Sequence, residues 1–207
     1  MNKNNVALDE HDFRLFSDIH GDAQSFERML LRNDPRRYDV CLGDVVDGLE
    51  PGRCLELVNQ YCSVAIRGNH DYDIADLTKE ERGIVELFVP SFRRKNLLLF
   101  HGMPESAFEY PFNDADIEPA MLRHPTIDVF FSGHLHIPRI AILSKSGGEI
   151  SFEETQGSYS RHDLDLEKNR YFINIPSVAN PRYNSRPGYG LLHHQSDTKK
   201  IFTFIYD

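Results

Sequence analysis

The sequence has 207 residues, 40% of them hydrophobic and 27% charged, which is enough chain for one domain with a substantial core. Its net charge of -9 at pH 7 disfavours binding to nucleic acid and acidic membranes, and no apolar run reaches the roughly 20 residues of a membrane helix. An N-terminus without an apolar signal segment, and three cysteines without metal-ligand spacing, predict a cytoplasmic protein with reduced, buried thiols.

The first predicted strand covers residues 13–16 and is followed by Asp18 and His20. In extended chain, side chains two apart point to the same side of the backbone, so these two would face one point. A carboxylate oxygen with an imidazole nitrogen suits Mn, Fe, Zn or Ni better than Ca. A surface turn would use the same residues, and that alternative stays open at this point. The helix predicted next has an apolar stripe of Phe26, Met29 and Leu30.

Two further strands end in polar motifs of the same kind. The strand at residues 38–42 leads into Asp44 and Asp47, and the strand at 63–67 leads into the sequence Gly-Asn-His-Asp at 68–71. Open α/β sheets bind ligands at the carboxyl ends of their strands, so the three strand ends predict one shared crevice. The alternatives are a plain turn for the first motif and a helix cap for the second. The helix predicted between them starts at Pro51 and buries Cys54, Leu55 and Val58.

Residues 77–92 predict a helix with Ile84, Leu87 and Phe88 facing inward, and residues 96–100 predict a buried strand that ends at His101. A single strand-end histidine is also typical of a hydrogen-bonded structural residue. Residues 103–124 predict a loop and one helix that form a wall over the site. The strand at residues 128–132 ends in His134 and His136, whose spacing brings both to one point only in extended chain.

Beyond these motifs the sequence predicts short strands separated by turns. We expect them to form a mostly antiparallel sheet stacked on the first. The segment 153–170 reads as an insertion that, with 103–124, decides specificity. The strands are expected at residues 139–143, 149–152, 171–174, 189–193 and 201–205.

The ordered motifs Asp-x-His, Gly-Asp-x-x-Asp, Gly-Asn-His-Asp, His-Gly and Gly-His-x-His resemble those of the calcineurin-like metallophosphoesterase superfamily, nearest its small bacterial phosphodiesterase branch. The resemblance spans residues 13–138 and continues more loosely to 174–178. It implies a single domain over residues 1–207 with an α/β fold, a two-sheet αββα sandwich of mixed sheets flanked by helices. It also implies hydrolysis of a small phosphodiester or nucleotide by attack of a metal-bridging hydroxide.

The resemblance further implies two divalent metal ions, with Mn expected first and Fe, Zn and Ni as alternatives. Asp44 would bridge the two ions, and His70, held by Asp47, would be the acid near the leaving group. Every implied ligand is present, although a scaffold with a vestigial site remains the non-enzymatic alternative. One ion would be held by Asp18, His20 and His136, and the other by Asn69, His101 and His134.

The substrate is less well specified. Protein phosphatases of the superfamily usually carry Arg where Gly48 stands and Glu where Asp71 stands, and that Arg clamps a dianionic monoester. Its absence favours phosphodiesters, with phosphomonoesters as the alternative. The expected binding partner is a small phosphoester substrate. Whether the chain also forms a homo-oligomer is left open. Three arginines could approach the substrate, although each could instead be packed or solvated: Arg67, Arg139 and Arg182.

Overall fold

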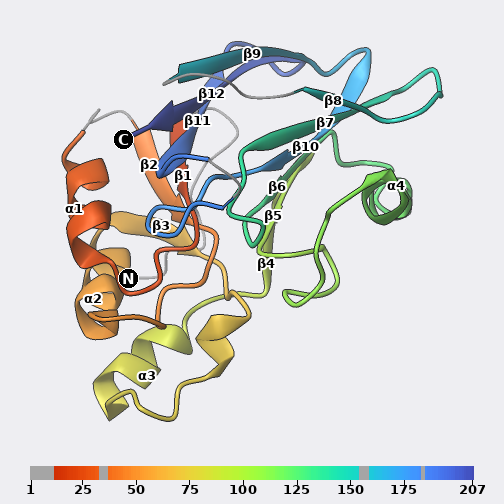
Figure 1. Ribbon diagram of the computed structural model, residues 1–207. Coiled ribbons are helices and arrows are strands. Elements are labelled where there is room, and N and C mark those ends of the chain that lie inside the picture. The colour runs from red at the N-terminus through yellow and green to blue at the C-terminus, as the bar shows by residue number, and fades with distance from the viewer. Residues whose placement is uncertain (1–11, 33–36, 154–158, 183–184) are drawn as a thin grey trace.

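The computed structural model describes residues 12–32, 37–153, 159–182 and 185–207. Two six-stranded sheets pack face to face, with helices α1 and α2 outside the first sheet and α4 outside the second (Figure 1). The predicted α/β fold, a two-sheet αββα sandwich of mixed sheets flanked by helices, is confirmed. The predicted absence of a signal segment falls on residues 1–5, which lie outside the described residues.

The first sheet carries the first three strand-end motifs. Its neighbours β3, β2 and β1 run parallel, so their carboxyl ends lie at the same edge, and the remaining strands join antiparallel. The strand order is β3 (Cys62–Ala65), β2 (Arg37–Cys41), β1 (Asp12–Phe16), β11 (Gly188–His194), β12 (Lys199–Tyr206) and β9 (Tyr159–Asp165).

The second sheet carries the other two motifs at the ends of its parallel strands β5 and β6. Strand β10 also runs parallel to β6, whereas β4, β7 and β8 pair antiparallel with their neighbours. The strand order is β4 (Ser91–Arg94), β5 (Leu97–Phe100), β6 (Val129–Ser132), β10 (Asn169–Asn174), β7 (Arg139–Ser144) and β8 (Ser151–Glu153).

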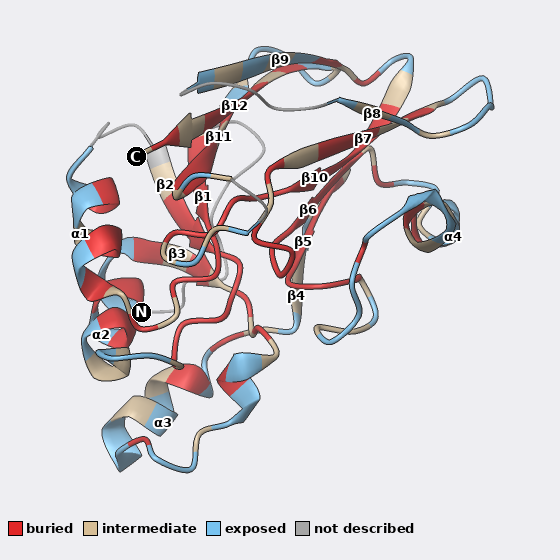
Figure 2. Cartoon of the chain, viewed as in Figure 1, coloured by how far each residue is buried: buried red, intermediate tan, exposed pale blue. Residues whose placement is uncertain are grey.

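Apolar side chains fill the space between the sheets and the space under the helices, and Figure 2 shows the inner strands buried and the outer helix faces exposed. The predicted inward faces of α1 and α2 are buried, and so are all three cysteines, none of which forms a disulfide within the described residues. No described helix is long and apolar enough to cross a membrane. The helices are α1 (Ala23–Leu31), α2 (Pro51–Tyr61), α3 (Lys79–Val85) and α4 (Asp114–Arg123), with a 3-10 turn η2 (His70–Tyr72).

The helix predicted at 77–92 is shorter in the structure. It begins at a capping box of Thr78 and Glu81 and ends at Val85, and Leu87, predicted to face inward, is 70% exposed. Residues 91–94 form strand β4, paired with the buried strand β5. Pro90 disfavours helical backbone at the residue before it. Pairing of residues 91–94 with β5 then outweighs the helical pattern of their sequence.

The second-half strands do not form one antiparallel sheet, so that prediction is wrong. Strands β11 and β12 extend the first sheet beside β1, and β10 lies parallel beside β6 in the second. The predicted insertion 153–170 contains strand β9, which pairs with β12; its residues 154–158 lie outside the described ones. Alternation along a strand shows which face is buried, but it carries no information about which sheet the strand joins.

A buried ion pair ties the first sheet to α1. Arg14 is 2% exposed, and its Nε and Nη2 each donate to a carboxylate oxygen of Asp39 at 2.7 Å. Its Nη1 donates to the carbonyls of Met29 at 3.2 Å and Arg32 at 2.9 Å, at the C-terminal end of α1. The guanidinium therefore holds β1, β2 and the helix end together through one fully bonded group.

We expect Asp39→Asn to lower the free energy of unfolding by about 3–5 kcal/mol, because it leaves the Arg14 charge buried without its counterion. The measurement is urea unfolding followed by circular dichroism. Arg123→Gln is the matched control: it removes an exposed pair with Glu105 and should leave stability nearly unchanged. Equal effects of the two substitutions would contradict the role given to Arg14.

Candidate metal centre

The five polar motifs meet between the two sheets, at the loops that leave β1, β2, β3, β5 and β6 (Figure 1). Two groups of side chains offer ligand atoms that lie within 4.8 Å of one another, and Asp44 belongs to both. The first group is Asp18, His20, Asp44 and His136, and the second is Asp44, His101 and His134.

Asn69 joins the second group, because its Oδ1 lies 3.1 Å from Nε2 of His101. The structure thus brings together all seven side chains that the sequence proposed as ligands, in the two sets implied by the resemblance. Asp44 is 1% exposed, and its Oδ2 lies 3.1 Å from Nε2 of His101. A carboxylate between two sets of nitrogen and oxygen donors is the arrangement of a bridging ligand.

Three of the histidines are oriented by hydrogen bonds from Nδ1. His101 donates to the carbonyl of Leu42 at 2.8 Å, because a carbonyl oxygen can only accept. In the same way His136 donates to the carbonyl of Asn180 at 2.5 Å. His20 Nδ1 lies 2.6 Å from a carboxylate oxygen of Asp47. Each bond fixes the tautomer and leaves Nε2 facing the centre, as in metal-binding histidines.

The donor set fits divalent cations. Nε2 of His134 is buried, and no described atom pairs with it, although buried polar atoms are normally paired. Burial, with the neighbouring His101, lowers the pKa of His134 to about 4, so the ring is neutral at pH 7 and its nitrogen can ligate. Burial opposes the charged form of His101, but the adjacent Asp44 carboxylate raises its pKa to about 9. Burial also opposes the charge of Asp18, yet the bond to His136 holds its pKa well below the ordinary value.

The backbone at the candidate ligands differs from the prediction. We expected the side chains of Asp18 and His20, and of His134 and His136, to face one point through extended chain. Asp18 and His20 do belong to one group, but the extended backbone was wrong for both pairs, and the two histidines belong to different groups. The chain leaves each strand and enters the left-handed region, which Asp, Asn and His tolerate better than most residues. The left-handed positions are Asp18 (φ 55°), His20 (φ 46°), Asp44 (φ 55°), His134 (φ 71°) and His136 (φ 62°).

Asp71 is the supporting residue whose role the sequence did not show. It is fully buried, and its carboxylate accepts backbone N–H groups from Asp44 at 2.9 Å and Gly68 at 2.9 Å. It also accepts from Val45 at 2.8 Å and Val46 at 3.2 Å. Burial and the Asp44 charge raise the pKa of Asp71 to about 6, while the backbone donors act against that rise. The motif Gly-Asn-His-Asp drew attention to this position, but only as a helix cap.

His70 and Asp47 lie outside both ligand groups. Nδ1 of His70 is 3.2 Å from one carboxylate oxygen of Asp47, whose other oxygen contacts His20. The His70 side chain is 47% exposed. Burial opposes the charge of Asp47, but its bond to His20 and the nearby His70 keep its pKa below the usual value.

A cavity of about 620 Å³ opens beside the first group and lies within the size range of small-molecule sites. Of the three arginines considered, Arg182 lines it and is exposed. Arg67 instead donates to the carbonyl of Val85 at 2.9 Å, and Arg139 packs over the ring of Phe152 at 3.7 Å. The lining of the cavity includes His20, Asp22, Asp47, Glu50, His70, His136, Asn180 and Arg182.

Two stacked mixed sheets with clustered acid and histidine side chains at their strand ends define a metal-binding α/β protein. Residues 12–197 match the calcineurin-like phosphoesterase superfamily domain, and the chain belongs to that superfamily. Among curated proteins, an uncharacterized protein of Methanocaldococcus jannaschii is 27% identical over 194 residues, which are 81% of this chain and 76% of the relative.

Solved structures share the fold. A metallophosphoesterase from Sphaerobacter thermophilus has a TM-score of 0.74 and 22% identity, covering 95% of this chain and 89% of that one. A hypothetical protein from Pyrococcus horikoshii has a TM-score of 0.59 and 11% identity, covering 95% and 88%. A variant of Vps29 from Entamoeba histolytica has a TM-score of 0.51 and 16% identity, covering 95% and 93%.

Asp44→Asn should weaken binding of both cations together, because it removes the one carboxylate common to the two groups. The stoichiometry of Mn²⁺ after equilibrium dialysis measures this. His134→Ala is the comparison, since it removes a donor from the second group alone and should cost one ion. Loss of a single ion in Asp44→Asn would contradict the bridging position.

Asp71→Asn should lower Mn²⁺ affinity roughly 10–100-fold without removing a ligand. The carboxylate of Asp71 offers two oxygens to the backbone N–H groups around Asp44, whereas the amide of asparagine offers only one. Isothermal titration calorimetry gives the affinity. Asp73→Asn, two residues further along on an exposed position, is the matched control. Unchanged affinity in the Asp71 variant would show that the turn around Asp44 holds without it.

Proposed function

We propose that the protein is a dinuclear divalent-metal-dependent phosphoesterase whose substrates are small phosphodiesters or nucleotides. The observation that carries the proposal is the place of Asp44 in both ligand groups. When bound, a pair of divalent cations makes water acidic enough to supply hydroxide and offsets charge on the phosphate. Carboxylate and imidazole donors favour Mn²⁺ as the first candidate, and Fe, Zn and Ni also fit.

The charges of the cavity support a requirement for cations. The chain carries a net charge of -9, and the described lining of the cavity includes the carboxylates of Asp22, Asp47 and Glu50 against the guanidinium of Arg182. A phosphoester anion would be repelled by that lining alone. Cations in the two ligand groups would reverse the local sign and let the anion bind.

His70 is proposed as the general acid. Its Nδ1 is held by Asp47, so Nε2 is free of that bond, and the ring lines the cavity. In its protonated form the ring can donate its Nε2 proton to the departing oxygen. The backbone N–H of His70 donates to Oδ1 of Asp44 at 2.9 Å, which sets the acid beside the second group.

The backbone at Gly48 supports a preference for diesters. Its φ is +116°, and a Cβ there would lie 2.0 Å from the carbonyl oxygen of His20, so this backbone admits no side chain. An arginine clamp for a dianionic monoester therefore cannot stand at this position. One observation favours the alternative, a phosphomonoesterase: Arg182 lines the cavity and could bind a dianionic monoester in place of the missing arginine.

Turnover of bis-p-nitrophenyl phosphate and p-nitrophenyl phosphate by the Mn²⁺-loaded protein tests the proposal. We expect the larger kcat/KM for the diester. A strong preference for the monoester would replace the proposal with the phosphomonoesterase, and Arg182→Ala would then abolish that preference. Less than one tightly bound ion per chain, with neither ester hydrolysed, would overturn both functions.

His70→Ala should retain both ions and lose about 10²–10⁴-fold in kcat, because general acid catalysis contributes on that order. The loss should grow as the leaving group becomes poorer, so alkyl esters should suffer more than p-nitrophenyl esters. Steady-state kinetics and metal content are measured on the same preparation. His193→Ala on β11 is a surface control whose side chain is 50% exposed. If the His70 variant instead loses a metal ion, the residue is a ligand and not the acid.

A further inference from the structure

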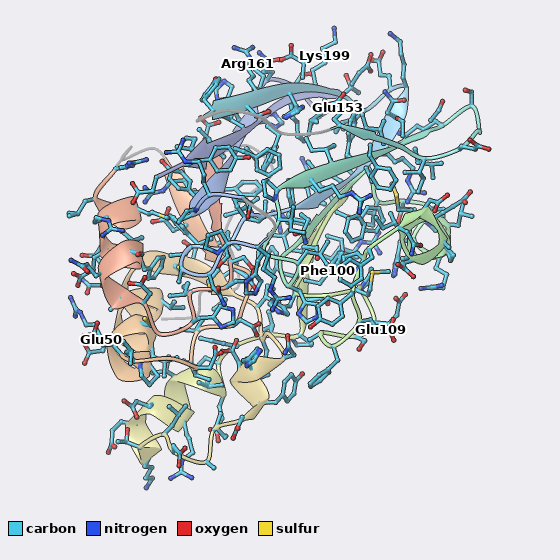
Figure 3. All side chains as sticks on the ribbon, viewed as in Figure 1. Glu50, Phe100, Glu109, Glu153, Arg161 and Lys199 are labelled. Atoms are coloured by element: carbon cyan, nitrogen blue, oxygen red, sulfur yellow. The ribbon has the colours of Figure 1, made fainter. Side chains whose placement is uncertain are left out.

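Four exposed aromatic side chains stand beside the candidate metal centre and take no part in the proposed chemistry. One belongs to η2 and three to the loop between β5 and α4, which carries Glu109, labelled in Figure 3. Residues 108–113 of this loop are mostly exposed, as the pale blue segment before α4 in Figure 2 shows. We call this set the aromatic wall: Tyr72 (48% exposed), Phe108 (59%), Tyr110 (40%) and Phe112 (46%).

The aromatic wall reaches the second ligand group directly. The ring of Tyr110 lies on the ring of His134, with centroids 3.8 Å apart and planes 32° apart. Tyr110 also stacks on Phe112 at 5.2 Å and 12°. Tyr72, two residues after His70, contacts Phe108 at 5.4 Å. The wall therefore consists of two ring pairs, one that begins two residues after the candidate acid and one that contacts the second ligand group, and none of its four residues lines the cavity.

The rings are held in place by the backbone behind them. Gly102 packs against the loop so closely that a Cβ there would lie 2.5 Å from the carbonyl oxygen of Glu109. Met103 and Ser106 exchange backbone hydrogen bonds of 2.8 and 3.1 Å, which close the turn before Phe108. On the other segment, the guanidinium of Arg67 lies 5.1 Å from the centroid of the Tyr72 ring. The wall is thus formed before a ligand arrives, which lowers the entropy cost of binding.

Exposed pairs of large rings next to polar ligand atoms are typical of a binding site. Stacked rings present π-faces, which suit another planar ring better than a flexible aliphatic chain. The contact with His134 places such a ring next to the position of the phosphate.

We propose that the aromatic wall binds a planar aromatic group of the substrate, a nucleobase or a simple aryl ring, while the phosphodiester lies at the candidate metal centre. This inference rests on the proposed function and narrows its substrate class. Tyr110 would be the specificity-determining residue, because it joins the wall to His134.

The test uses three diesters with the same p-nitrophenolate leaving group, whose second substituent is methyl, phenyl or 5′-thymidyl. The Mn²⁺-loaded protein should show about tenfold higher kcat/KM for the thymidyl ester than for the methyl ester, mostly through KM. A similar advantage for the phenyl ester identifies a simple aryl subsite, and a thymidyl advantage alone identifies a nucleobase subsite. Hydrolysis of all three at equal kcat/KM would overturn the aromatic wall and leave the proposed function intact.

Tyr110→Ala should abolish the advantage of the aromatic esters, and Tyr110→Phe should keep it, because phenylalanine retains the stacking face. Tyr61→Ala is the control, an aromatic residue on α2 with similar exposure (49%). The readout is the ratio of kcat/KM for the aromatic esters to kcat/KM for the methyl ester. A variant that loses activity on all three esters equally leaves this ratio unchanged. If Tyr110→Ala lowers all three esters equally, the ring only positions His134 and the inference fails.

Equilibrium binding gives a second readout that does not need turnover. Thymidine 5′-phosphate should perturb tyrosine fluorescence and bind about tenfold more tightly than ribose 5-phosphate, and Tyr110→Ala should remove the difference. If no diester is hydrolysed but this difference is present, the proposed function fails and the aromatic wall stands. Equal binding of the two phosphates overturns the wall.

Discussion

The left-handed backbone at the strand ends is the constraint on which the centre depends. Such positions cost on the order of 1–3 kcal/mol each and persist only where the surroundings fix them. Here the loops are bonded to one another: the N–H groups of Asp18 and His20 donate to the carbonyls of Gly43 and Asp44, both at 2.9 Å. The carboxylate of Asp71 also fixes the loop after β2, because it accepts the backbone N–H groups of Asp44 and Val45. Backbone strain and its compensation therefore coincide with the residues that face the centre.

The same geometry explains the electrostatics. Asp18 and Asp44 are almost fully buried, which opposes their negative charge, and each is offset by a histidine nitrogen at 3.1 Å. Those histidines turn Nδ1 to backbone carbonyls, so the nitrogens that offset the carboxylates are also the nitrogens that can bind a cation. Cations and protons compete for the same atoms, and metal binding to such a set releases protons. The centre is thus compact and polar, and its buried His134 nitrogen is the atom with most to gain from a cation.

The sequence predicted the fold class and which residues converge at the candidate site, but it did not predict which sheet each of the later strands joins. Asp44, His101 and His134 each follow a short strand within three residues, so their place at a strand end can be read locally. The sheet that receives β11 or β10 depends on contacts with strands far away in sequence, and the run that became β4 has a helical pattern. Asp71 was predicted only as a helix cap, because the backbone N–H groups of Asp44 and Val45 that its carboxylate accepts lie far away in sequence and leave no local signature. The predicted wall at residues 103–124 includes Phe108, Tyr110 and Phe112, but the sequence did not show the contact between Tyr72 and Phe108, which forms only in three dimensions.

The central claim is that two cations lie side by side between the sheets and share Asp44. An anomalous difference map from crystals of the Mn²⁺-loaded protein, collected on both sides of the manganese absorption edge, tests it most directly. The account predicts two peaks about 3.5–4 Å apart. One peak should contact Asp18, His20 and His136, and the other Asn69, His101 and His134. A single peak, or peaks away from Asp44, would contradict the account.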